Sequence, residues 1–411
     1  MGDASGSLKV SRSEVLSLLI PVALLITACT SKPLEFADWT IPVPEGTPII
    51  EYAAVPMEER TERIELVEDL VIGQRGDDPN YLLYGPTHVI ADSRGRIFVQ
   101  DTRNRRIQVY DSDGEYMMTL GQHGQGPGEF SGINGLALTR DRIVAVDRRN
   151  SRYTVFSASG ELLDTIPYDR SIGTVFRLTG LTNGSVLAMR EYPPAEEELW
   201  DPQVYQSGLA RLSEQMSLSN DIVRFPDYRE PMAIRGSEGN VFAAMTVSLP
   251  HPTQQAVAAS GGEVYATLTS EYQVFALQTG GQMVWALRVP WPRAPITNSE
   301  IEAEIAAFRS RQGWEDFTRA GYEWPELRPA IERIAVDGKG NLYVYVHPST
   351  AEDENGERMV DVYSPDGERL FSGWIASLRW RSARGDYVYA LDSDDQTGEE
   401  RVVRYRLAEP F

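Results

Sequence analysis

The stretch that decides the fold is RIFVQDTRNRRIQVYDSDGEYMMTL, residues 96–120, because the chain repeats it. The stretch RIVAVDRRNSRYTVFSASGELLDTI, residues 142–166, aligns with it without a gap. Each copy reads as an apolar strand, a polar turn, a second apolar strand, a tight turn and a third strand. The tight turns contain Asp113-Gly114 and Ser159-Gly160, pairs that suit hairpins needing positive φ. The repeat therefore predicts successive antiparallel strands.

The same pattern continues along the rest of the chain. Strands equivalent to 96–101 recur at 142–147, 185–190, 263–268, 341–346 and 387–392, and an inner strand precedes each of them. Repeats of roughly 40–50 residues with about four strands each are typical of a propeller. The strands are apolar on both faces, as expected where each blade packs between two neighbours. The sequence predicts an all-β fold, a six-bladed β-propeller of four-stranded antiparallel blades.

The ends of the chain predict how the ring closes. The sixth unit lacks a fourth strand, since the chain ends at Phe411 soon after the third. Residues 63–73 form a spare strand with no unit of its own. We expect this N-terminal strand to complete the last blade, which hides two sheet edges. The propeller is accordingly assigned to residues 61–411.

The long connections predict one elaborated face. They lie between second and third strands or between blades, at 191–206, 226–254, 291–329, 347–359 and 393–401. In an up-and-down blade these two kinds of connection share one end of the ring, and loops on a rigid scaffold commonly carry binding sites. One of them predicts a short helical insertion within about 297–328, because Thr297 and Glu300 form a capping-box pattern.

The N-terminus predicts export and lipidation. Lys9 and Arg12 precede an apolar run at 15–28 that is shorter than the about 20 residues needed to span a bilayer. This pattern is typical of a secretory signal, and its end, LITAC, resembles the bacterial lipobox, in which Cys29 would be acylated. A buried helix with an incidental cysteine is the alternative. We expect a lipoprotein signal peptide at 1–28, a lipid-anchored tether at 29–60, and a place in the bacterial cell envelope.

The charge limits the partners. Acidic residues outnumber basic ones by 60 to 39, which gives a net charge of −21. Such a surface repels phosphate backbones, so nucleic acid is excluded as a partner. The membrane is expected to be contacted only through the lipid anchor.

A family resemblance rests on residues 95–130, GRIFVQDTRNRRIQVYDSDGEYMMTLGQHGQGPGEF. The D-x-x-N-x-R turn and the GxGPGEF linker resemble the NHL-type repeat and the bacterial six-bladed β-propeller lipoproteins that carry it. The resemblance implies a six-bladed ring. It implies no single activity, because such rings include protein- and nucleic-acid-binding modules, cell-surface binding modules and a zinc-dependent lyase.

The glycine-rich linker at 121–130 could be mistaken for a phosphate loop. A phosphate loop lies between a strand and a helix N-terminus and usually carries a lysine. Here a strand follows and no lysine is present, so the linker is interpreted as a step between two blades. It places His123 and Glu129 on the elaborated face.

The strand ends Asp101 and Asp147 allow two interpretations. Carboxylates at a channel could hold calcium, as in related six-bladed esterases and lactonases. The structural interpretation is that each aspartate accepts hydrogen bonds from its own turn, with Asn104 and Asn150 in left-handed positions. We favour the structural interpretation.

Arginine and aromatic side chains define a candidate binding face. Such pairs suit a carbohydrate, a peptide or an anionic ligand. The alternative is that the arginines pair with local acids and the tryptophans seal the insertions onto the ring. The candidates are Arg103, Arg105, His123, Glu129, Arg148, Arg149, Tyr192, Trp200, Trp291, Trp314 and Trp324.

Catalytic signals are missing from the sequence. There is no G-x-S-x-G elbow, and no thiol nucleophile is left once Cys29 is acylated. His88, His251 and His347 are candidate metal ligands, although no two stand at ligand spacing. We predict a monomeric binding or protein-interaction module with no catalytic residue and no cofactor. The alternative is a metal-dependent enzyme, a lyase or a lactonase/esterase, using zinc or calcium at the channel mouth.

Overall fold

The computed structural model describes residues 41–408 apart from several internal segments. The segments outside the described part are 74–77, 141, 193–205, 227–228, 236–240, 249–254, 261, 313–325, 348–355 and 395–396. Residues 40–411 make up one compact unit.

The predicted propeller is confirmed: each blade is an up-and-down antiparallel sheet of four strands. Blade 1 comprises β3 (Pro86–Ala91), β4 (Ile97–Asp101), β5 (Arg106–Tyr110) and β6 (Tyr116–Leu120). Blade 2 comprises β7 (Ile133–Thr139), β8 (Arg142–Asp147), β9 (Arg152–Ser157) and β10 (Leu162–Pro167). Blade 3 comprises β11 (Thr174–Gly180), β12 (Val186–Tyr192), β13 (Gln206–Leu212) and β14 (Leu218–Pro226).

The other half of the ring has the same construction. Blade 4 comprises β17 (Gln255–Ser260), β18 (Glu263–Leu268), β19 (Gln273–Gln278) and β20 (Met283–Arg288). Blade 5 comprises β21 (Ile331–Val336), β22 (Leu342–Val346), β23 (Glu357–Tyr363) and β24 (Arg369–Ala376). Blade 6 comprises β25 (Arg379–Arg384), β26 (Tyr387–Ser393), β27 (Glu400–Ala408) and, from the N-terminal side, β2 (Arg63–Ile72).

The core lies between the blades. The described residues form six hydrophobic clusters, one at each interface between neighbouring blades. Alternate residues of one strand enter different clusters: Ile97 and Val99 pack toward blade 6, whereas Phe98 packs toward blade 2. This is why the strands are apolar on both faces, since side chains alternate across a strand and both faces are covered.

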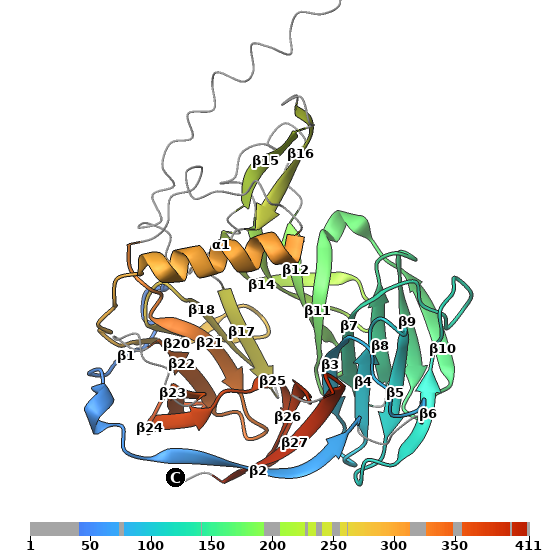
Figure 1. The fold of residues 1–411 in the computed structure, drawn as a ribbon, viewed down its shortest axis with the longest axis horizontal. Helices are drawn as coiled ribbons and strands as arrows, with labels where there is room; N and C mark the ends of the chain where they lie inside the picture. The colour runs from blue at the N-terminus through green and yellow to red at the C-terminus, as the bar shows by residue number, and fades with distance from the viewer. Residues whose placement is uncertain are drawn as a thin grey trace, which may run out of the picture. The chain divides into compact units, whose positions relative to one another are not determined.

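The ring closes as the sequence predicts. Strand β2 pairs antiparallel with β27 and so supplies the fourth strand of blade 6. Its first residues, Arg63 and Ile64, also pair in parallel with Trp374 and Ile375 of β24 in blade 5. In Figure 1 the blue β2 runs beside the red β27, so strands from opposite ends of the sequence share one blade.

Part of the stretch expected to be a tether is packed on the ring. Strand β1 (Ile49–Glu51) adds a parallel fifth strand beside β20, and a short 3-10 helix, η2 (Met57–Glu59), follows it. Arg60 Nη1 then lies 2.9 Å from Asp361 Oδ1 of β23, with both side chains almost fully buried. Trp374 Nε1 donates to the Arg60 carbonyl at 2.7 Å. We call residues 41–72 the N-terminal seam, because they bind blades 4, 5 and 6 together.

The insertions lie where the sequence places them. A hairpin of β15 (Arg229–Arg235) and β16 (Val241–Ser248) separates blades 3 and 4, and helix α1 (Asn298–Gln312) separates blades 4 and 5. The capping box forms, with Thr297 N donating to Glu300 Oε2 at 2.8 Å. Ile301 and Ile305 are buried. A further 3-10 turn, η3 (Arg170–Ile172), precedes blade 3. Within the described part of the chain, no helix is long and apolar enough to cross a membrane.

The D-x-x-N-x-R turns tie blades 1 and 2 to the linkers before them. Asp101 Oδ2 accepts from Asn104 Nδ2 and Arg106 Nε, both at 2.8 Å. Arg106 also donates to the Pro79 and Leu82 carbonyls in the incoming linker. The structural interpretation of the aspartate is therefore supported.

One detail of the predicted turn is wrong. The left-handed residues are Arg105, with φ of 54°, and Ser151, with φ of 52°, and not Asn104 and Asn150. The asparagine side chains are instead used as donors to the aspartate carboxylates. The residue with positive φ is therefore the one that follows the asparagine in each turn.

Candidate functional site

The central channel is the first candidate site. A cavity of about 680 Å³ lies between the inner strands, with walls from β3, β7, β11, β21 and β25. Its lining runs from Thr87 and His88, near the elaborated face, to Gly338, in the turn after β21, and Arg384, the last residue of β25, at the opposite end. The cavity therefore follows the inner strands along their length.

A β-bulge interrupts the inner strand at this channel in every blade whose inner strand lines the cavity. The pairing register shifts at Thr87, Asn134, Phe176, Glu332 and Arg381. A bulge leaves one residue unpaired and turns its side chain away from the regular alternation. As a result, adjacent residues such as Phe176 and Arg177 can both line the cavity.

The channel wall is cationic although the protein is acidic. Arg177 of β11 and Arg381 of β25 line the cavity and are accessible to solvent within it. Burial among protein atoms lowers the pKa of both guanidinium groups, and the neighbouring Arg177 charge lowers the pKa of Arg381 further. No carboxylate of the described residues forms an ion pair with either arginine.

His88 belongs to the same wall. Burial, followed by the charges of Arg177 and Arg381, lowers the pKa of His88 to about 4. The imidazole is therefore neutral at pH 7, because protonation would place a charge at a buried position close to two arginines.

Gln100, opposite His88 in the sheet, is buried against the cavity. Its Nε2 donates to the Ile133 carbonyl at 3.1 Å and to Thr87 Oγ1 at 2.8 Å. Its Oε1 has no donor among the described residues. A buried acceptor of this kind is open to an O–H or N–H group from water or from a bound molecule.

The described residues do not provide a metal site. No group of three or more histidine, cysteine, aspartate or glutamate side chains within them is arranged to hold a metal ion. His88 lies on the channel wall, whereas His347 follows β22, and its carbonyl accepts from Trp291 Nε1 at 3.0 Å. The third candidate ligand, His251, lies outside the described residues.

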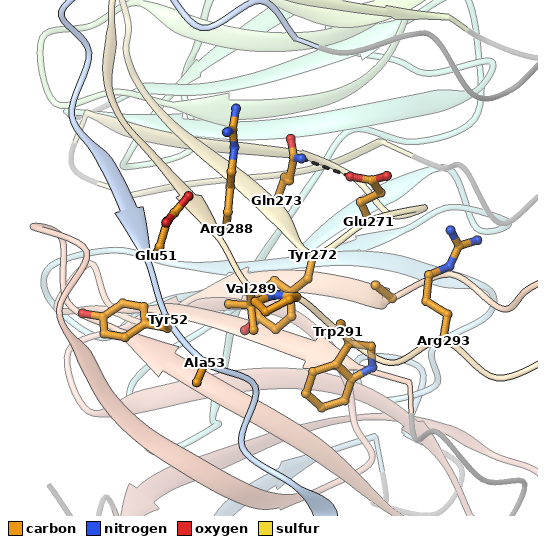
Figure 2. A pocket seen from close by; sticks show the side chains of 12 residues that line it. Glu51, Tyr52, Ala53, Glu271, Tyr272, Gln273, Arg288, Val289, Trp291 and Arg293 are labelled. Atoms are coloured by element: carbon orange, nitrogen blue, oxygen red, sulfur yellow. Dashed lines mark hydrogen bonds between the residues drawn. The ribbon is translucent and has the colours of Figure 1, made fainter.

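A second cavity, of about 650 Å³, lies at the rim where blades 4 and 5 meet the N-terminal seam. Figure 2 shows Glu51 and Tyr52 of the seam beside Arg288, Tyr272 and Trp291, with Gln273 donating to Glu271. Tyr272 is buried, and its hydroxyl donates to Asp361 Oδ2 at 2.7 Å. This rim pocket is therefore backed by the network that fixes the seam.

Trp291 is the one tryptophan among the candidates that the structure describes. Its ring packs edge-on against Tyr272, and the Arg60 guanidinium lies over it at 5.3 Å. Its indole N–H donates to the His347 carbonyl. Trp291 therefore both lines the rim pocket and seals the seam.

The four candidate arginines occupy equivalent turns of blades 1 and 2. Arg103 is exposed and lies over the Tyr84 ring at 4.8 Å, and Arg149 is also exposed. Arg105 and Arg148 are half-buried. None of the four forms an ion pair with a described carboxylate. Their charges are therefore available to a ligand on this face.

The glycine-rich linker is held internally. Glu129 accepts from Gln122 Nε2 at 2.9 Å and from Gly126 N at 2.8 Å, and these hydrogen bonds lower the pKa of Glu129. Arg152 donates to the Gly126 and Glu129 carbonyls. His123 is exposed beside them. The carboxylate of Glu129 thus organises its own loop.

Tyr192 lies between two arginines. The guanidinium groups of Arg190 and Arg224 lie 4.1 and 4.2 Å from its ring centre. Its hydroxyl donates to Asp221 Oδ1 at 2.6 Å, and burial followed by this hydrogen bond raises the pKa of Tyr192 to about 12. The arginines here are neutralised by Asp221.

Several sequence candidates lie outside the described residues. These are Cys29, Trp200, Trp314 and Trp324.

The sequence analysis missed Arg177 and Arg381. A signal was present, because both arginines stand in the middle of innermost strands, TVFRLTG and SLRWRS, in a chain with a net charge of −21. Unneutralised charge at the innermost strand of a ring is unusual, since charged groups are rarely enclosed without partners.

Comparison with known proteins agrees with the fold. Residues 80–182 match the family DUF5128, described as a 6-bladed beta-propeller. No curated protein matches the sequence.

Solved structures with a similar fold have low sequence identity to this chain. A "Putative exported protein" of Bacteroides fragilis is 12% identical, with a TM-score of 0.48, over 88% of this chain and 99% of its own. A DUF4221 family member of Bacteroides vulgatus is 11% identical, with a TM-score of 0.48, over 84% and 98%. The virginiamycin B lyase of Staphylococcus aureus is 9% identical, with a TM-score of 0.41, over 84% and 99%.

Proposed function

We propose that the protein is an exported lipoprotein whose propeller is a binding module, and that its ligand enters the central channel from the elaborated face. The observation that carries this proposal is the cavity of about 680 Å³ along the inner strands. Its size is within the range of small-molecule sites. The wall also offers unneutralised cations and a free buried acceptor, which are groups that can orient a ligand.

The elaborated face would supply the specificity of the module. The turn arginines of blades 1 and 2 lie on this face with the ends of the inner strands that begin the channel. Carbohydrate, peptide and anionic ligands all suit arginines next to aromatic side chains. A protein partner could use the same face.

Equilibrium dialysis tests the binding function. The full-length protein is dialysed against a small-molecule extract of bacterial cells, and the retained compounds are identified by mass spectrometry. Thr179→Trp places a large side chain on the channel wall and narrows the cavity. Thr165→Trp, on the outer strand β10, is the matched control. We expect the wild type and the control to retain a compound unchanged and Thr179→Trp to lose it. Equal retention by all three folded proteins would contradict a channel ligand.

The alternative function is a metal-dependent enzyme. The observation that favours it is the position of His88 on the channel wall, since neutral histidine can act as a base or a ligand. Metal analysis of the full-length protein separates the two. Stoichiometric zinc or calcium, together with chemical conversion of a retained compound, would favour the enzyme.

The lipid anchor has its own test. Cys29→Ser is expected to move the full-length protein from the membrane fraction to the soluble fraction. An unchanged distribution would contradict lipidation at Cys29.

A further inference from the structure

We propose that the channel binds an oxyanion, the carboxylate or phosphate group of a small organic acid, between the guanidinium groups of Arg177 and Arg381. This inference rests on the proposed function and names the chemical class of its ligand. Guanidinium groups suit both kinds of oxyanion, because their planar N–H donors match the oxygen geometry.

The two arginines come from inner strands on different blades. Arg177 follows the bulge in β11 of blade 3, and Arg381 is itself the unpaired bulge residue of β25 in blade 6. Both line the same cavity. Because the bulges release them from the regular alternation, the fold directs two cations from different sides of the ring into one enclosed space.

The charges around them are predominantly positive. Among the described residues, the cavity lining contains the following ionisable groups: His88, Asp92, Arg140, Arg177, Arg381 and Arg384. Asp92 is the only acid among them, and it is occupied by Arg96 Nη2 at 2.7 Å and by two backbone N–H groups of its own turn. The strand β17, QAVAAS, carries no charged residue in its sequence. An anion entering the channel would therefore meet cations that lack a fixed counter-charge.

The energetics favour such an anion. Burial lowers the pKa of both channel arginines, and the charges of Arg177, Arg379 and Arg333 lower that of Arg381 further; Arg333 is itself paired with Glu332 at 3.8 Å. Both arginines are accessible to solvent within the cavity, so water screens part of the repulsion between their charges. A bound oxyanion would relieve this repulsion and satisfy the exposed N–H donors at once.

Aromatic groups beside the arginines indicate the rest of the ligand. Phe176 is 37% exposed in the cavity, directly before Arg177 in the chain. Trp380 precedes Arg381 and packs edge-on against Tyr343 at 5.1 Å. An organic anion with a planar or apolar part would contact these rings, whereas inorganic phosphate would not.

Calorimetric titration of the full-length protein tests the site. Sodium benzoate, sodium acetate and inorganic phosphate are the probes, at constant ionic strength with chloride as the reference. The variants are Arg177→Gln, Arg381→Gln and the double variant. Arg94→Gln is the matched control, because Arg94 is exposed in a turn and does not line the cavity.

The wild type and the control are expected to bind the probes, with benzoate tighter than acetate. Each single variant should weaken binding about tenfold to a hundredfold, as expected when a hydrogen bond to a charged group is lost. The double variant should show no binding of the probes. Arg177→Lys keeps the charge and should lose less than Arg177→Gln, which guards against a variant that only misfolds.

Two results would overturn the inference: no binding of any probe by the wild type, or equal binding by the folded double variant. Its failure can be told apart from failure of the proposed function. If dialysis retains only a neutral compound, the proposed binding function is supported and the oxyanion site is contradicted. If benzoate binding depends on the two arginines but dialysis retains no cellular compound, the oxyanion site is supported and the proposed function is contradicted.

Discussion

Arginine side chains lie inside the ring in two places: they are buried in the N-terminal seam and accessible to solvent in the central channel. In the seam, Arg60 faces Asp361 at 2.9 Å and donates to the Val55 and Val360 carbonyls. In the channel, Arg177 and Arg381 line one cavity, the Arg177 charge lowers the pKa of Arg381, and no described carboxylate forms an ion pair with either. The seam arginine is paired with a carboxylate of the fold itself, whereas the channel arginines are exposed to solvent and pair with no described carboxylate.

The difference teaches how to separate structural from functional charge in this protein. A buried ion pair that loses one partner leaves an uncompensated charge and is strongly destabilising. A solvated guanidinium without a partner has no such role in the fold. Substitutions in the seam should therefore reduce stability, and substitutions in the channel should reduce binding.

Deletion of β2, residues 63–72, should have the largest effect. It removes the fourth strand of blade 6 and the pairing with β24, so the ring opens and the clusters on both sides of blade 6 are exposed. We expect loss of the cooperative thermal transition in circular dichroism. Deletion of residues 49–51 is the control, because it removes the short strand β1 at the edge of blade 4 and leaves the pairing of β2 with β27 in place. If the protein without β2 still folds cooperatively, the conclusion that the seam is needed for stability is contradicted.

Asp361→Ala should have the next largest effect. The substitution leaves the Arg60 guanidinium buried and unpaired and removes the acceptor of the Tyr272 hydroxyl. We expect a loss of about 3–5 kcal/mol in the free energy of unfolding, measured by urea denaturation. The double variant Arg60→Met/Asp361→Leu should lose less than the single one, because it leaves no isolated charge. A loss below about 1 kcal/mol for Asp361→Ala would show that the seam pair is not structural.

Most of the fold could be predicted because the repeat constrains it at several levels. The gapless match of residues 96–120 with 142–166 fixed the unit, and apolar residues on both strand faces indicated that each blade packs on two sides. The spare strand at 63–73 then had one open position to fill. These signals are local or periodic, so a sequence displays them directly.

The channel site could not be predicted in the same way. Arg177 and Arg381 are far apart in the chain, and they line one cavity only because the ring closes and a bulge occurs in each strand. A bulge shifts the alternation by one residue, which the sequence pattern does not specify. The candidate arginines in the blade turns could be identified from the sequence because they stand close together along the chain, within the repeated turns.

Glu300→Gln should have a small, pH-dependent effect. Glu300 caps helix α1 and pairs with Arg328 at 2.7 Å, and these interactions outweigh desolvation and lower its pKa from 4.5 to about 2. A lowered pKa in the folded state means that the stabilisation is present above the unfolded pKa and is lost as pH falls through about 2. The side chain is 39% exposed, so solvent screening limits the loss at pH 7 to about 0.5–1 kcal/mol.

Denaturation of Glu300→Gln and the wild type between pH 7 and pH 2 checks this. The difference between the two should be constant above about pH 4.5 and should shrink toward zero near pH 2. Glu302→Gln, on the exposed side of the same helix, is the control and should show no such trend. A difference that grows on acidification would contradict the sign.

Arg177→Gln should have the smallest effect on stability, and it tests the comparison most directly. Arg190, on the next strand of the same blade, pairs with Asp221 at 2.6 Å, whereas Arg177 forms no such pair with a described residue. Urea denaturation of Arg190→Gln should show a loss of about 1–3 kcal/mol, since a hydrogen-bonded charge is removed. For Arg177→Gln we expect a change within about 0.5 kcal/mol, on the stabilising side, because repulsion with Arg381 is relieved. Equal losses for the two variants would mean that the channel arginine also serves the fold, and the separation between structural and functional charge would not hold.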